Sequence, residues 1–229
     1  MEHPLLLLSL ALEATPLKDF AHHYPHVLYS WLVMIVLIAF GWLAGKGVQM
    51  IPGKAQNVFE VIIDGIENFQ MEMMGEEGRP YFPLIATIGL YVFACNLMGL
   101  VPGMFSPTAN INTTLSLALV TFFTTHIVGI KCHGVKYVKH FMGPLLPLAP
   151  IMVPIEIISH LSRVLSLTLR LFGNIMGEDL VVAILMILAG QFLAPLPMMG
   201  LAIFTSFVQA FIFALLSMLY IGGAIEHAH

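Results

Sequence analysis

An arginine stands inside an apolar segment of the sequence, where a buried charge needs an explanation. Arg170 is flanked by Leu169 and Leu171. A guanidinium keeps its proton at every accessible pH, so this side chain cannot relay protons itself. It can act as a fixed cation that attracts an ionised carboxylate and repels a free proton or another cation. The carboxylate belongs either to this chain, as an internal ion pair with Glu178 or Glu156, or to another chain.

Polar residues recur on the helix face that carries Arg170. At about 100° per residue, those within roughly 80° of Arg170 around the helix axis are Glu156, Ser159, Ser162, Arg163, Ser166, Asn174 and Glu178. Asp179 points to the opposite side, which suits a second polar environment there. Ionisable side chains within a membrane segment are costly, so this stripe is a candidate functional site. Arg163 is expected to extend its charge to the nearer membrane surface.

Two further groups of polar residues stand in apolar surroundings. Gln209 can hydrogen-bond across to Arg170 or hold water, or it can simply join two helices. The cluster from Asn110 to Thr114 is too polar to face lipid at the start of a span. Its members Asn112 and Thr114 either line a water-filled vestibule or help to cap a helix.

The composition places these residues in a membrane. Of 229 residues, 59% are hydrophobic and only 10% are charged, whereas a soluble domain carries about 25% charged residues. The net charge of −4 argues against nucleic-acid binding. Cys95 and Cys132 have neither a disulfide nor a metal-ligand spacing, and His22, His23 and His26 are read as free side chains outside the membrane. No metal or cofactor is expected.

The chain is therefore predicted to be an all-α polytopic membrane protein, with an extramembrane segment over 1–26 and a single membrane domain over 27–229. The apolar runs predict spans over about 27–45, 81–101, 111–130, 155–193 and 198–222. Lys and Arg cluster between the first two spans and after the third. By the positive-inside rule, the N-terminus lies outside and the C-terminus is cytoplasmic.

The fourth segment is too long for an upright helix. Prolines at 144, 147, 150 and 154 precede it and prolines at 195 and 197 follow it, and a proline is expected to break a helix. Its 39 residues would extend about 58 Å, against a hydrocarbon core of about 30 Å. We expect it to lie steeply tilted or to be broken near Gly173 or Gly177, with the final helix packed antiparallel beside it.

Between the first two spans, the apolar and polar residues of about 55–75 recur with the spacing of an amphipathic helix, which we expect on the cytoplasmic surface. Apolar side chains such as Phe59, Ile62 and Phe69 share one side, and acidic side chains such as Glu60 and Asp64 fill the other. An acidic face would be repelled by anionic lipid headgroups. The helix either offers this face to a protein partner or lies in the interface without one.

Four motifs occur together in one order. They are NLMGLVPG from Asn96, TANINTTLSLAL from Thr108, SLTLRLFGN from Ser166 and VQAFIFALLSMLY from Val208. These motifs resemble subunit a of the F-type ATP synthase, the membrane stator that faces the rotating ring of c subunits. The resemblance covers roughly Asn57 to the C-terminus.

The resemblance implies a role for each matching residue. Arg170 matches the family's essential arginine, which interacts with the carboxylate of each passing c subunit and blocks a direct proton leak. Gln209 matches a glutamine close to that arginine, and Asn174 matches the asparagine one turn after it. The polar positions of the family's cytoplasmic half-channel correspond to Glu156, Ser159, Ser162 and Ser166.

The outer half-channel departs from the family pattern at one position. Asp179 stands where the family often has a glutamate, but Ala202 replaces a histidine that some members carry. Asp179, Asn112 and Thr114 are then expected to carry protons with water, with Glu178 beside them in the pathway.

The function implied is that of a proton-translocating stator with two offset half-channels and Arg170 as the barrier between them. Such a chain is not an enzyme by itself. The implied partners are the c-subunit ring, the b subunits of the peripheral stalk and the lipid bilayer, in the plasma (inner) membrane of a bacterium. The alternative is a secondary transporter or channel that binds a small anion at Arg170 and works without a c-ring.

Overall fold

The structure is a computed structural model that describes residues 18–46, 53–101, 103–134, 137, 149–189 and 195–226. They form helices and no strand, which confirms the all-α prediction. Five helical stretches are long and apolar enough to cross a membrane. They contain helices α3 (Pro25–Gly45), α5 (Phe82–Gly99), α6 (Ile111–His133), α8 (Ala149–Ala189) and α9 (Pro195–Glu226). A short helix, α2 (Lys18–His23), precedes them.

Helix α8 differs from its prediction in two ways. It is one continuous helix of 41 residues, so of the two alternatives, a steep tilt or a break near Gly173 or Gly177, the break is absent from it. It also begins six residues before position 155 and runs through Pro154, so the prediction that this proline breaks the chain is wrong. Pro150 falls in the first turn, where a missing N–H costs nothing, and Pro154 removes only one hydrogen bond close to the helix start. The predicted end at 193 lies outside the described residues.

Helix α9 likewise begins earlier than predicted and ends later, over Pro195–Glu226 instead of 198–222. Pro195 and Pro197 were expected to separate the two long helices. Both instead lie in the first turn of α9, where the fixed φ of proline suits a helix and no intrahelical N–H bond is lost.

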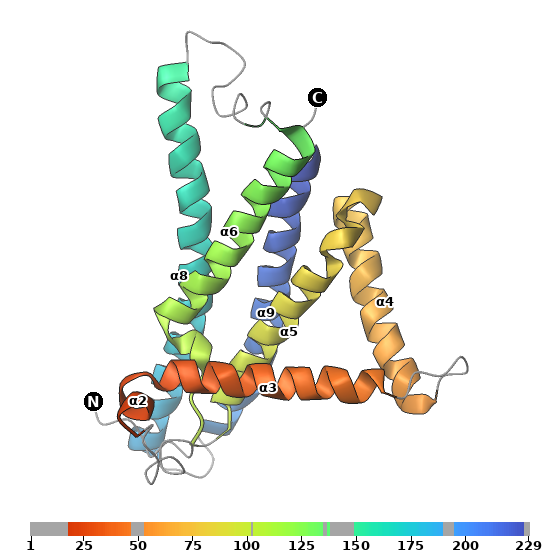
Figure 1. The fold of residues 1–229 in the computed structure, drawn as a ribbon. Coiled ribbons are helices and arrows are strands. Elements are labelled where there is room, and N and C mark those ends of the chain that lie inside the picture. The colour runs from red at the N-terminus through yellow and green to blue at the C-terminus, as the bar shows by residue number, and fades with distance from the viewer. Residues whose placement is uncertain are drawn as a thin grey trace.

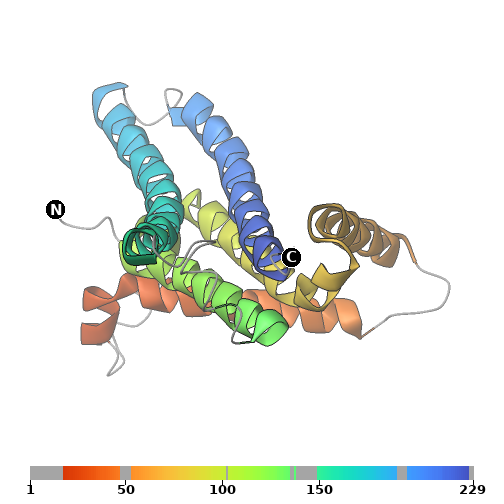
Figure 2. The ribbon, with the colours of Figure 1, turned by 90° about the horizontal axis from the view of Figure 1, so that it is seen from above.

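Helices α5, α6, α8 and α9 pack into one bundle, whereas α3 runs across it (Figure 1). Figure 2 shows the same crossing from above, with α8 and α9 side by side. At 1.5 Å per residue, α3 is about 32 Å long, close to the hydrocarbon thickness of about 30 Å, while α8 is about 62 Å long. If α3 stands upright, α8 and α9 are steeply tilted, which is the arrangement that the length of the fourth segment predicts.

Helix α4 (Lys54–Met74) is the amphipathic helix predicted over 55–75. Figures 1 and 2 show that it also runs across the direction of α3, at the C-terminal end of that helix. An upright α3 therefore leaves α4 along the membrane surface. Val61, Ile62 and Ile63 are exposed within this chain, so α4 has apolar side chains free to contact lipid. On its polar side, Glu67 forms an ion pair of 2.8 Å with Arg79.

The core lies where the four bundle helices meet. One cluster contains Val92 of α5, Ala118 of α6, Phe213 of α9 and a stripe of α8 that includes Leu167 and Leu171. These side chains are nearly inaccessible to solvent. The core thus fixes which face of α8 is buried and leaves its other face, which carries Arg170, outside the bundle.

The connection between α5 and α6 is fixed by a buried polar network. Ser106 Oγ donates to the backbone oxygen of Cys95 at 3.0 Å, and Thr108 Oγ1 donates to Asn96 Oδ1 at 2.6 Å. Asn96 Nδ2 in turn donates to the backbone oxygen of Ser206 at 3.5 Å. The network therefore ties this connection to both α5 and α9.

Replacing Thr108 with valine should destabilise the protein by about 1–3 kcal/mol, because it leaves the buried Asn96 carbonyl without its donor. The free energy of unfolding in a detergent titration measures this. Thr124→Val is the matched control, since the Thr124 hydroxyl donates only to Val120 O within its own helix. Equal effects of the two substitutions would contradict the proposed importance of the network.

Candidate functional site

Arg170 lies on the exposed side of α8. Its neighbours Ser166, Leu169 and Gly173 are exposed on the same side, and nothing within 4 Å would meet a Cβ at Gly173. Among the described residues, no carboxylate lies within 4.0 Å of the Arg170 guanidinium. The internal ion pair with Glu156 or Glu178 is therefore not formed, and the cation faces outward from a helix of membrane-spanning composition.

The amide of Gln209 joins α9 to α8 one turn beyond Arg170. Asn174 Nδ2 donates to Gln209 Oε1 at 2.9 Å, and Gln209 is 4% exposed. The described contacts contain no hydrogen bond from Gln209 to Arg170. The amide pair thus holds α8 and α9 together beside the arginine, and Asn174 remains exposed at the same surface.

A cavity of about 380 Å³ opens where α6, α8 and α9 come together near the first turns of α8. Its polar lining includes Thr125, Tyr137, Glu156, His160 and Arg163. A smaller space of about 20 Å³ shares three of these residues and extends as far as Leu167. That volume exceeds the roughly 10–15 Å³ that one water molecule needs.

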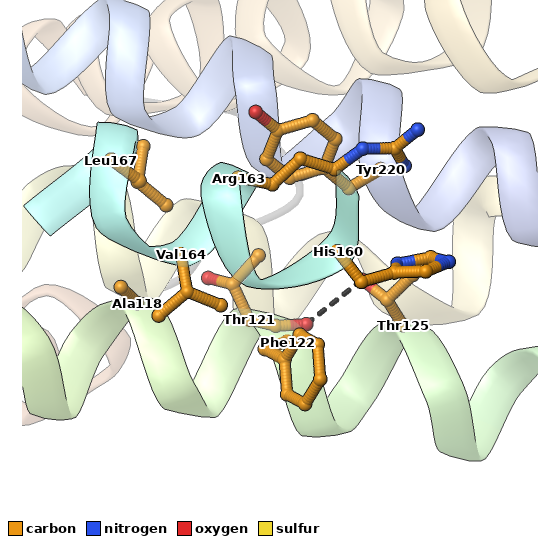
Figure 3. Close-up of a pocket in the computed structure, with 9 residues that line it drawn as sticks. All are labelled: Ala118, Thr121, Phe122, Thr125, His160, Arg163, Val164, Leu167 and Tyr220. Carbon is orange, nitrogen blue, oxygen red and sulfur yellow. Dashed lines mark hydrogen bonds between the residues drawn. The ribbon is translucent and has the colours of Figure 1, made fainter. Parts of the chain in front are cut away.

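Figure 3 shows the smaller space, with the His160 and Arg163 side chains extending in the same direction. The Arg163 guanidinium lies over the Tyr220 ring of α9, with Cζ 5.5 Å from the ring centroid. Arg163 therefore contacts α9 in addition to lining the larger cavity.

The serines of the predicted stripe lie outside both of these spaces. Ser162 Oγ donates to the backbone oxygen of Ser159 at 2.7 Å, and Ser162 and Ser166 are exposed. Of the predicted stripe, Glu156 and Arg163 line the cavity, while Ser162, Ser166 and Arg170 share the outward face. The helical pattern placed all of them on one side, but the packing of α6 and α9 divides that side in two.

A second cavity, of about 440 Å³, lies between α3, α5 and α6 near the start of α6. Its polar residues include His26, Ser30, Tyr91, Asn112 and Ser116. The Asn110 side chain caps α6 by accepting a hydrogen bond from the Asn112 backbone at 2.9 Å. Thr114 is fully buried, donates to Ile111 O and does not line this cavity. The polar start of α6 therefore combines a helix cap with a polar cavity wall.

Glu178 and Asp179 lie further along α8. Asp179 is exposed, and Glu178 is half-buried beside Thr205 of α9. Ala202, where a histidine is found in some relatives of the resembled family, is 4% exposed. Neither carboxylate lines the cavity near Asn112. Among the described residues, no three histidine, cysteine or acidic side chains are grouped closely enough to hold a metal ion.

Three residues in or next to the larger cavity were not among the site residues predicted from the sequence. His160 Nε2 lies 3.3 Å from Glu156 Oε1, one helical turn away. The His126 ring of α6 lies 4.9 Å from the His160 ring between centroids, and its Nδ1 shares a hydrogen bond of 2.8 Å with Tyr137 Oη. The spacing of four residues from Glu156 could have identified His160. No sequence signal connects His126 or Tyr137 to α8.

Comparison with known proteins extends the resemblance to most of the chain. The family described as "ATP synthase A chain" matches residues 27–222. A protein of Syntrophobacter fumaroxidans named "ATP synthase subunit a" is 56% identical over 239 residues, which cover the whole of both chains. A protein of the same name from Desulfosudis oleivorans is 55% identical over 229 residues, again covering both chains fully. The similarity thus begins well before Asn57.

Proposed function

The chain belongs to the ATP synthase A chain family, and from this premise we propose that it forms two offset proton half-channels against a ring of c subunits, with Arg170 as the barrier between them. The family assignment makes it a multi-pass membrane subunit of the ATP synthase complex, a proton-channel subunit that is not catalytic by itself. The half-channels, their residues and the partner subunits are the proposal.

The observation that carries the proposal is the position of Arg170. A guanidinium that faces outward from a membrane helix needs a counter-charge, because an unpaired charge in lipid costs at least a few kcal/mol. No described carboxylate of this chain supplies one. The surrounding Ser162, Ser166, Gly173 and Gly177 are small, which allows another helix to approach closely. A carboxylate carried past this face by a second subunit is the natural partner.

The mechanism follows from the cost of charge in lipid. A c-subunit carboxylate must be neutral while it faces lipid and can ionise only against this chain. A proton that enters from outside neutralises one carboxylate, which then leaves Arg170 and turns into the lipid. Another carboxylate arrives from the other side, releases its proton to the cytoplasm and pairs with Arg170. Each charge that crosses 100 mV supplies about 2.3 kcal/mol.

The cytoplasmic half-channel is assigned to the cavity that contains Glu156, with Ser159, Ser162 and Ser166 leading toward Arg170. This assignment is supported by the space of about 380 Å³ and its smaller extension toward Leu167. Water can fill a polar cavity of that size, and water carries protons between side chains.

The outer half-channel is assigned to Asp179 and Glu178, together with Asn174 and Gln209 beside Arg170. The hydrogen bond between Asn174 and Gln209 supports this assignment, because it keeps two polar amides next to the arginine. Asn112 borders a separate cavity, which we assign to the entrance from outside. Thr114 is buried and does not line that cavity, so no cavity supports its place in the proposed proton pathway.

The chain is proposed to sit in the bacterial plasma (inner) membrane with its N-terminus outside and its C-terminus in the cytoplasm. The basic residues Lys46, Arg79 and Lys131 then lie at cytoplasmic ends of helices. Helix α4 lies on the same side, where its acidic face is proposed to meet the b subunits of the peripheral stalk. Glu67 is paired with Arg79 and Glu60 accepts a hydrogen bond of 2.7 Å from Gln56, so Asp64 and Glu72 are the acidic side chains that we assign to the partner.

Reconstitution tests the proposal against an anion transporter that works alone. Vesicles holding this chain alone should show no proton or anion flux under an imposed potential, because one wall of each half-channel is missing. Vesicles that also hold the c-ring should conduct protons, and blocking ring rotation by cross-linking should stop the current. Transport of a small anion by the chain alone would overturn the stator function.

A further inference from the structure

Two histidines and a tyrosine from three parts of the chain meet beside the cavity that holds Glu156: His160 and Tyr137 line it, and His126 contacts both of them. His160 Nε2 is 3.3 Å from Glu156 Oε1 within α8. The ring of His126, from α6, lies 4.9 Å from the His160 ring, centroid to centroid. Tyr137 Oη is 2.8 Å from His126 Nδ1. The groups thus form a continuous series from the α8 carboxylate to a phenol beyond the end of α6.

We propose that His126 and His160 are a proton-relay pair that passes protons between Glu156 and the water of the cavity at the cytoplasmic end. This inference rests on the proposed function, because it deepens the exit path of the same protons. Imidazole is suited to the task since it exchanges protons near neutral pH and has two nitrogen atoms, one to accept and one to release.

The transfer changes only O–H and N–H bonds. The protonated carboxyl of Glu156 gives its proton to Nε2 of His160, which leaves a carboxylate and an imidazolium. The imidazolium then releases a proton from its other ring nitrogen to cavity water or to His126. The proton finally passes to bulk water, and both imidazoles return to the neutral form. No oxidant, metal or covalent intermediate takes part.

The surroundings favour rapid release over storage of the proton. Arg163 lines the same cavity as His160 and places a fixed positive charge near both imidazoles. Two adjacent imidazoles beside a guanidinium disfavour a second added proton. Glu156 is the only acidic group among the described residues that line this cavity, and Tyr220 of α9 is part of the same lining. One proton at a time therefore occupies the pair.

Tyr137 holds the orientation of His126. Burial raises the pKa of Tyr137, and the nearby Glu156 carboxylate adds to the increase while Arg163 opposes it. The phenol therefore stays protonated near neutral pH, and its oxygen can accept a hydrogen bond from the Nδ1–H of His126. In that tautomer the accepting lone pair of the neutral His126 ring is on Nε2, which can take up a proton from His160.

The test measures ATP-driven proton pumping by the complete complex in vesicles, from about pH 5 to about pH 8, where imidazole titrates. His160→Ala should lower the pumping rate about tenfold near neutral pH, less than the roughly 10²–10⁴ lost with a general acid–base group, because cavity water still carries part of the proton flux. Added imidazole should restore part of the rate through the open cavity. His160→Gln keeps the volume of the side chain but cannot exchange a proton, so it should be slow even where assembly is normal.

His133→Gln is the matched control. His133 lies near the same end of α6, where its Nε2 bonds to the backbone oxygen of Ala224 at 2.9 Å, but it does not line the cavity. This variant should pump at the native rate with the native pH profile. The amount of assembled ATP synthase complex in the membranes is measured for every variant.

Two results would overturn the relay. One is a native rate and pH profile in both His160 variants. The other is a loss that imidazole does not restore and that leaves the pH profile unchanged, which would mean a packing role. Arg170→Ala in the same vesicles separates failure of the relay from failure of the proposed function. If Arg170→Ala loses pumping while His160→Gln pumps normally, the relay is wrong but the proposed function stands.

Discussion

Arg170→Ala is expected to abolish both proton-driven ATP synthesis and ATP-driven proton pumping. Without the guanidinium, an ionised c-subunit carboxylate has no counter-charge at the interface, and protons can pass from one half-channel to the other without turning the ring. Loss of a charge-assisted contact in a low-dielectric site commonly costs about 10²–10³ in rate. Synthesis, pumping and passive proton leak in vesicles measure the three consequences separately.

Two variants control for effects other than the charge at position 170. Arg79→Ala removes an arginine that forms a surface ion pair with Glu67, so it should leave coupling intact. Arg170→Lys keeps the charge but loses the planar fork, so it should retain part of the barrier and less of the turnover. Normal pumping by Arg170→Ala would contradict the stator mechanism.

Asp179→Asn is expected to have the second-largest effect, a loss of about a hundredfold in proton flux, as for removal of a general acid–base group. Asp179 is an exposed carboxylate of the proposed outer half-channel, where the buried Ala202 position carries no ionisable group. In that proposal Asp179 exchanges protons on the outer side of Arg170, and an asparagine cannot do so. Proton flux through the reconstituted complex as a function of outside pH measures the loss.

Two comparisons isolate the role of this carboxylate. Asp179→Glu keeps an ionisable group and should keep most of the flux. Glu178→Gln changes the adjacent residue, which is half-buried beside Thr205, and should reduce flux less. If Glu178→Gln had the larger effect, the outer proton group would have to be reassigned to Glu178.

The sequence predicted the parts of this molecule that depend on one helix at a time. Periodicity identified the face of α8 that carries Ser166, Arg170 and Asn174, because side-chain direction within a helix follows from spacing alone. The length of the fourth segment predicted either a steep tilt or a break, and the helix is unbroken over its 41 described residues, so the steep tilt stays the prediction. Proline tolerance was misjudged, since Pro154, Pro195 and Pro197 all lie within helices, close to a helix start.

Features built from several helices could not be predicted from the sequence. His126 reaches His160 only because α6 packs against α8, and no periodicity records that contact. Periodicity left open whether Gln209 bonds to Arg170, holds water or joins two helices, and its hydrogen bond with Asn174 depends on how α9 lies against α8. Helical periodicity placed Ser162 and Glu156 on one side of α8. The packing of α6 and α9 instead leaves Glu156 in the cavity and Ser162 on the outward face.

The contact of α9 with α4 has a mechanical consequence. The ring centroids of Phe69 and Phe211 lie 5.4 Å apart, and a Cβ at Gly222 would lie only 3.2 Å from Met74 Cγ. The two helices are therefore in close contact at two places along their length. In the proposed stator, a turning c-ring would push sideways on α8 and α9. Through these two contacts, part of that force would pass into the surface helix α4. The contacts of Phe211 and Gly222 would then help to set how far the stator yields elastically under load.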